Sequence, residues 1–109
     1  MIKDIVQFKE LLLELNADAL FVEQDGCDDA IIGVSHRFGL PPVVAYDYEK
    51  CIQAFMDSGM TLEEAEEHME YNVLGTYLGD SMPVFIDRRY TTDEQESKYL
   101  PIPKYFLTK

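Results

Sequence analysis

The stretch that decides the fold runs from residue 43 to residue 64 and reads VVAYDYEKCIQAFMDSGMTLEE. Its first residues, Val43–Tyr46, are mostly β-branched or aromatic and predict a short strand. Asp47 is a favourable N-cap for the helix that follows, and Gly59 is a typical residue at the end of a helix. Thr61–Glu64 has the T-x-x-E pattern of a capping box, which opens a second helix. The stretch therefore predicts a strand followed by a helical hairpin.

The residues before this stretch predict one more helix and a β-hairpin. Residues 4–15 carry apolar side chains at helical spacing after Asp4, which can cap the first turn. Two apolar runs, residues 19–23 and 30–34, flank a polar turn centred on Gly26. Short apolar runs on both sides of a glycine-containing turn are typical of a hairpin.

Proline and a final apolar run complete the expected sheet. Residues 35–42 predict a loop, because Pro41 and Pro42 lack the N–H group that a central strand donates. Residues 84–88 predict the last strand. We expect one α+β domain over residues 1–90, with elements in the order α-β-β-α-α-β. A small, mainly antiparallel sheet would have its helices packed on one face.

The charge of the chain is segregated along the sequence. The 109 residues carry a formal net charge of −12, and between Cys51 and Asp87 there are eight acidic residues and no Lys or Arg. Phosphate binding depends on Lys and Arg, so this balance disfavours direct binding to DNA, RNA or anionic membranes. A strongly acidic surface instead suits a basic partner, such as the nucleic-acid groove of another protein.

The acidic run supplies the main candidate site. Carboxylates three and four residues apart on a helix lie about 5–6 Å from one another, so they can imitate a phosphate backbone as a DNA mimic does. The simpler interpretation is a solvated helix face that keeps the protein soluble, and a general acid/base pair would need burial that such a row lacks. The candidate partner-binding residues are Glu63, Glu64, Glu66, Glu67, Glu70 and Asp80.

The stretch from Gly26 to Ile86 resembles a known group of proteins. The strings DDAIIGVSHRFG, PPVVAYDYEKCI, GMTLEEAEEHMEYNVLGTYLGD and PVFI are similar in content and order to a widespread family of small proteins encoded by phages and prophages. The resemblance carries over no catalytic residues. It implies an accessory protein of a bacterial virus that acts in the host cytoplasm.

Given this context, the first functional hypothesis is an inhibitor of bacterial defence. Small acidic phage proteins often block defence enzymes by occupying a nucleic-acid-binding surface, and the likeness to anti-CRISPR proteins is an analogy of size and charge. We therefore expect a non-enzymatic inhibitor without a cofactor, whose partner is a basic, nucleic-acid-binding host protein.

The remaining polar residues allow two alternative sites, one for a small molecule and one for a metal ion. A small nucleotide or signal molecule could bind the 35–42 loop through His36 and Arg37, facing Tyr46 or Tyr48. Three carboxylates in one turn, with His36, could form the centre of a metal-dependent hydrolase, although their spacing fits no EF-hand and turn chemistry explains them equally well. These three carboxylates are Asp25, Asp28 and Asp29. We expect no bound metal.

The cysteines and the C-terminal residues allow three further predictions, on the state of the thiols, on membrane spans and on the tail. Cys27 and Cys51 form no CxxC pair and accompany no signal peptide, so we expect reduced thiols, with Cys51 in the core and Cys27 in an exposed turn. No apolar run reaches the length of a membrane span. Residues 91–98 predict a polar linker and residues 99–107 an apolar tail. The tail would dock on its own domain, on a partner, or on a neighbouring subunit of a homo-oligomer.

Overall fold

The computed structural model describes residues 4–76 and 78–90, and its order of elements confirms the predicted α+β class. The helices and strands are α1 (Ile5–Leu15), β1 (Ile31–Arg37), β2 (Leu40–Asp47), α2 (Tyr48–Asp57), α3 (Leu62–His68) and β3 (Val84–Ile86). Three short helical turns accompany them: the 3₁₀ helices η1 (Cys27–Ala30) and η3 (Arg88–Tyr90), and the π-helix η2 (Met69–Leu74). The predicted linker and tail, residues 91–109, lie outside the described residues.

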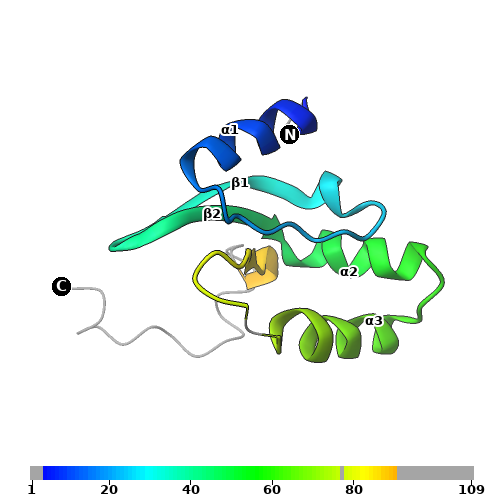
Figure 1. Cartoon of the computed structure of the whole chain (residues 1–109). Helices are drawn as coiled ribbons and strands as arrows, with labels where there is room; N and C mark the ends of the chain where they lie inside the picture. Colours follow the sequence, from blue (N-terminus) through cyan, green and yellow to red (C-terminus); the bar gives the residue numbers. More distant parts are fainter. Residues whose placement is uncertain (1–3, 77, 91–109) are drawn as a thin grey trace.

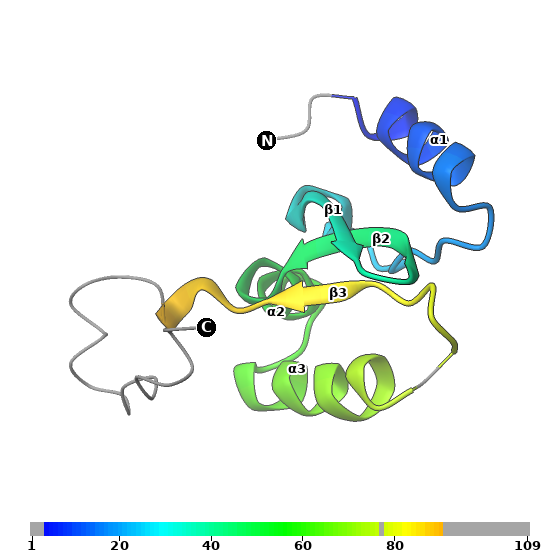
Figure 2. The same cartoon turned by 90° about the vertical axis from the view of Figure 1, so that its left-hand side faces the viewer.

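The sheet is mixed, with β2 between its two neighbours. β1 and β2 form an antiparallel pair in which Ile31 lies opposite Tyr46 and Arg37 opposite Leu40. β3 pairs with the end of β2 in parallel, and Figure 2 shows these two strands pointing the same way. The longer pairing is therefore antiparallel, and the short β3 is added after the chain has passed through α2 and α3.

The hairpin lies at a different place from the predicted one. The 35–42 stretch is not a loop: it forms the end of β1, a two-residue turn at Phe38 and Gly39, and the start of β2. Pro41 and Pro42 are tolerated because β3 pairs only with the last residues of β2, and the β1–β2 register is irregular between Ser35 and Arg37.

The apolar run 19–23 forms no strand. Its backbone donors go to other groups: the Leu20 N–H donates to the Ser81 carbonyl at 3.2 Å, and the Val22 N–H donates to the Tyr46 hydroxyl at 2.9 Å. Because those donors are satisfied by a turn and by a side chain, the run is extended chain beside the sheet. The predicted strand at residues 19–23 is therefore wrong.

The three helices contribute to one core. Leu12 of α1, Phe55 of α2 and Ala65 of α3 belong to one cluster with Val44 and Tyr46, which share one face of β2. The antiparallel arrangement of α2 and α3 is visible in Figure 1 and confirms the predicted helical hairpin. Among the helices of residues 4–76 and 78–90, none combines the length and apolarity that a membrane crossing needs.

The caps predicted from the sequence are present. The Asp47 carboxylate accepts from the Lys50 N–H at 3.1 Å and caps α2. The Thr61 hydroxyl accepts from the Glu64 N–H, and the Glu64 carboxylate accepts in return from the Thr61 N–H. These contacts fix where the acidic helix begins and how its faces point.

Candidate functional site

The acidic residues of α3 and η2 form most of one exposed helix surface. Glu63, Glu67 and Glu70 are exposed and follow one another at intervals of four and three residues. None of the three makes a hydrogen bond or an ion pair with the residues that the structure describes. Their carboxylates therefore meet solvent as a row of uncompensated negative charge, which we call the acidic row.

The other predicted partner-binding residues lie differently. Glu64 is exposed, but one of its oxygens is held by the capping box. Glu66 is half-buried, and its charge adds to the larger effect of burial that raises the pKa of Tyr48. Asp80 is exposed in the turn before β3, where its carbonyl accepts from Arg37 at the far end of the hairpin. Of the six predicted partner-binding residues, only Glu63, Glu67 and Glu70 therefore form a row of exposed carboxylates without partners among the described residues.

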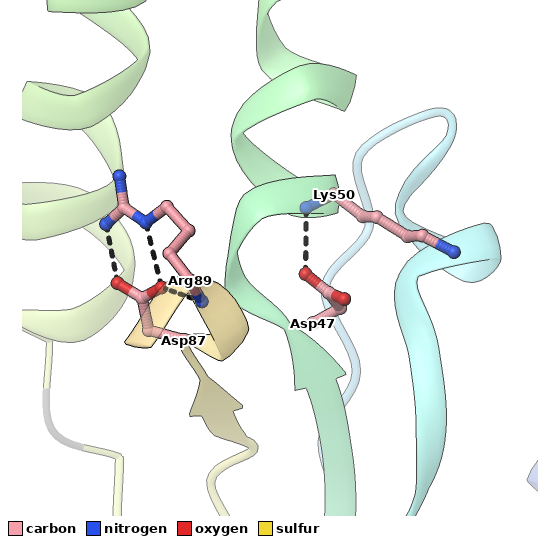
Figure 3. A network of polar contacts seen from close by, with 4 residues as sticks. All are labelled: Asp47, Lys50, Asp87 and Arg89. Atoms are coloured by element: carbon pink, nitrogen blue, oxygen red, sulfur yellow. Dashed lines mark hydrogen bonds and ion pairs between the residues drawn. The ribbon is translucent and has the colours of Figure 1, made fainter. Parts of the chain in front are cut away.

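Charged residues at the end of β3 and in η3 lie beside the start of α2. Figure 3 shows Asp87 bonded to Arg89 and, separately, Asp47 bonded to the Lys50 N–H. Arg89 donates two bonds to the Asp87 carboxylate, at 2.8 and 2.5 Å, and its guanidinium lies 5.5 Å from the centre of the Tyr48 ring. Arg88 pairs with Asp47 at 3.5 Å. The hydrogen bond from Arg89 lowers the pKa of Asp87, while burial raises the pKa of Tyr48. These arginines therefore have partners of their own outside the acidic row.

A shallow hollow of about 380 Å³ lies beside the acidic row. The Tyr71 side chain is 70% exposed and lines this hollow together with Glu67. His68 at the same wall contacts Asn72 at 3.2 Å, and its ring meets the Phe55 ring edge-on with 4.7 Å between the ring centres. An exposed aromatic ring beside a carboxylate can hold a guanidinium group by stacking and ion pairing.

Sequence reasoning missed this hollow because it depends on the π-helix. Met69–Leu74 forms one wide turn in continuation of α3, and such turns are frequently found at functional sites. The apolar spacing of Ala65 and Met69 predicts an ordinary helix, and both residues are indeed buried. No signal in the residue pattern distinguishes the π-turn, which therefore had to be seen in the structure.

The residues of the predicted nucleotide site are not brought together. His36 is exposed near the turn of the hairpin, and Arg37 donates to the carbonyls of Pro41 (3.1 Å) and Asp80 (2.6 Å). Tyr46 lies at the other end of β2, fully buried and stacked on Phe85 at 5.4 Å, and burial raises the pKa of its hydroxyl. Tyr48 follows beyond that end, in α2.

The three carboxylates of the 25–29 turn, which were the candidate metal site, have different surroundings. Asp28 forms an ion pair with Lys9 of α1 at 3.0 Å. Asp25 and Asp29 line a larger hollow of about 550 Å³ between this turn and α2. In the described part of the chain, no three Asp, Glu, His or Cys side chains are grouped so that they could hold a metal ion.

The site geometry is thus an acidic row, a tyrosine-walled hollow beside it and a separate polar hollow at the 25–29 turn. Comparisons of the chain with protein-family models, with curated proteins and with solved structures found no match. The resemblance to phage-encoded proteins therefore stays a prediction from the sequence.

Proposed function

We propose that this protein is a non-enzymatic inhibitor that binds a basic, nucleic-acid-binding surface of a host protein through the acidic row. The observation that carries the proposal is the exposure of Glu63, Glu67 and Glu70 without an ion-pair or hydrogen-bond partner among the described residues. The resemblance to phage-encoded proteins adds the context, a bacterial defence enzyme in the host cytoplasm.

Electrostatics explains how such a surface would act. Successive carboxylates at this helical spacing lie about 5–6 Å apart, so several basic side chains can each meet one negative charge. Complementary charge mainly raises the association rate and the specificity, and exposed pairs are screened by salt. Tyr71 would add a stacking platform for an arginine at the edge of the row.

The first prediction concerns the acidic row itself. Replacing Glu63, Glu67 and Glu70 together by Lys should abolish capture of the partner, because each like charge now repels the basic surface. The measurement is an affinity pull-down from bacterial lysate at low and at high salt, with mass spectrometry of the retained proteins. Wild-type protein should retain a nucleic-acid-binding enzyme that high salt or added duplex DNA releases.

A matched variant separates the site from net charge. Glu10, Glu14 and Glu23 are exposed acidic residues outside the row, and replacing them by Lys changes the net charge equally. This variant should still capture the partner. If both variants lose partner capture equally while circular dichroism shows that they are folded, a defined binding face is contradicted. Net charge alone would then cause the capture.

A second candidate function, a homo-oligomer, is favoured by the exposed aliphatic side chains of α1. Val6 and Leu15 are 68% and 64% exposed, and Leu11 and Leu13 are exposed as well. A helix that leaves four aliphatic side chains in water can pack against another apolar surface. Light scattering after gel filtration would test this function: a monomer at every concentration would contradict it, and a dimer lost on replacing Leu11 and Leu15 by Ser would support it.

A further inference from the structure

Cys27 and Cys51 lie side by side in the core, although the sequence placed Cys27 in an exposed turn. Both side chains are fully buried and free, η1 packs against α2, and each thiol is close enough to the other to shift its pKa. Cys27 belongs to η1 and Cys51 to the first turns of α2. Two thiols from separate elements are therefore in contact, within one apolar cluster.

The backbone around Gly26 explains this contact. Gly26 has a φ of +90°, and a Cβ atom at this position would lie 3.3 Å from the Cβ of Ala54. A residue with a side chain would be strained and crowded here, so glycine allows the turn to approach α2 closely. The next residue, Cys27, is thereby directed at the face of α2 that carries Cys51.

The contact makes the two thiols chemically unequal. The hydrogen bond from the Cys51 thiol lowers the pKa of Cys27, against the opposing effect of burial. The same hydrogen bond and burial raise the pKa of Cys51. Cys27 is therefore the better nucleophile of the pair, because the thiolate is the reactive form.

Both cysteines are buried, but an open hollow lies next to the pair. The hollow of about 550 Å³ at the 25–29 turn is lined by Gly26, Lys50 and Ala54. Gly26 precedes Cys27 in the chain, Lys50 precedes Cys51, and Ala54 follows Cys51 by about one helical turn. A local opening of η1 would therefore expose the thiols to this hollow without unfolding the sheet.

We propose that Cys27 and Cys51 are a site of oxidative modification, which a hydroperoxide converts into an intramolecular disulfide. The Cys27 thiolate attacks one oxygen of hydrogen peroxide, the O–O bond breaks, and Cys27 becomes a sulfenic acid. The other oxygen leaves as hydroxide and takes up the proton that the Cys27 thiol released, which gives the first water. The Cys51 sulfur then attacks the Cys27 sulfur and displaces the hydroxyl, which leaves as water with the Cys51 proton. The two thiols lose two electrons and two protons, and hydrogen peroxide is reduced to two waters.

The disulfide would tie the 25–29 turn to α2. A covalent link between residues 27 and 51 restricts the unfolded chain, so the melting temperature of the oxidised protein should rise by roughly ten degrees. This modification is independent of the acidic row, so its failure would leave the proposed function unaffected.

Peroxide treatment of the reduced full-length chain tests the site. Intact mass spectrometry should show a loss of about 2 Da, reversed by dithiothreitol, and a non-reducing digest should join the two cysteine peptides. The Cys51→Ser variant should stop at the sulfenic acid, a gain of about 16 Da that dimedone captures, whereas Cys27→Ser should react much more slowly. Circular dichroism checks that both variants are folded.

Two outcomes would overturn the proposal. The first is oxidation that gives only intermolecular dimers or sulfonic acids. The second is oxidation of the wild-type protein only in denaturant that unfolds it, because the thiols would then react as separate groups in an open chain. The wild-type result decides the proposal even if neither serine variant folds.

Discussion

At the scale of single residues, Asn16 shows how one side chain can connect three parts of the fold. It is 8% exposed, and its amide nitrogen donates to the Pro42 carbonyl at 2.9 Å and to the Ser81 hydroxyl at 3.1 Å. Its amide oxygen accepts from the Asp18 N–H at 3.1 Å. The end of α1, the start of β2 and the turn before β3 are thus held by one group that both donates and accepts.

Replacing Asn16 by Asp should lower the free energy of unfolding by about 2–3 kcal/mol, because the carboxylate cannot donate and the Pro42 carbonyl loses its partner. Urea unfolding would measure this change. The matched control is Gln7→Glu, which makes the same chemical change on an exposed part of α1 and should change the stability by less than about 0.5 kcal/mol. Similar losses in both variants would contradict the role of Asn16.

At the scale of elements, the acidic row makes α3 and η2 less stable than they could be. Glu67 lies four residues after Glu63 and three before Glu70, and like charges at these spacings repel each other. Glu63 lies in the first turn, where the helix dipole favours a negative charge, and Glu70 lies beyond that favourable end. Repulsion tolerated within one element is consistent with a surface kept for binding.

Replacing Glu67 and Glu70 by Gln should therefore raise the free energy of unfolding by about 0.5–1 kcal/mol at low salt, with a smaller gain at high salt. Chemical unfolding at both salt concentrations measures the effect. Glu63→Gln removes a charge of the same row in the favourable first turn and should bring no gain. A salt-independent gain would show that repulsion between the carboxylates is not its cause.

At the scale of the whole molecule, the sequence predicts what local chemistry controls. Asp47 and the Thr61–Glu64 box could be placed because an N-cap needs only neighbouring residues. The 19–23 run, the hairpin turn at Gly39 and the π-helix depend on contacts between distant segments, such as the Val22 N–H with the Tyr46 hydroxyl. The acidic row could be predicted from spacing, whereas the hollow at Tyr71 and the contact between the cysteines could not.

The last prediction concerns the charged residues at the end of β3 and in η3. The hydrogen bonds from Arg89 lower the pKa of Asp87 below its value in the unfolded chain. The carboxylate therefore adds stability above about pH 4, where an ordinary Asp is ionised, and this contribution is lost as the pH falls through the lowered pKa of Asp87.

The free energy of unfolding of wild-type protein minus that of Asp87→Asn should be positive and constant from pH 5 to pH 7, then shrink below about pH 4. Urea unfolding across this range measures the difference. Arg89→Gln should remove the same acid-dependent step, and a step that persists in that variant would show that another carboxylate causes it.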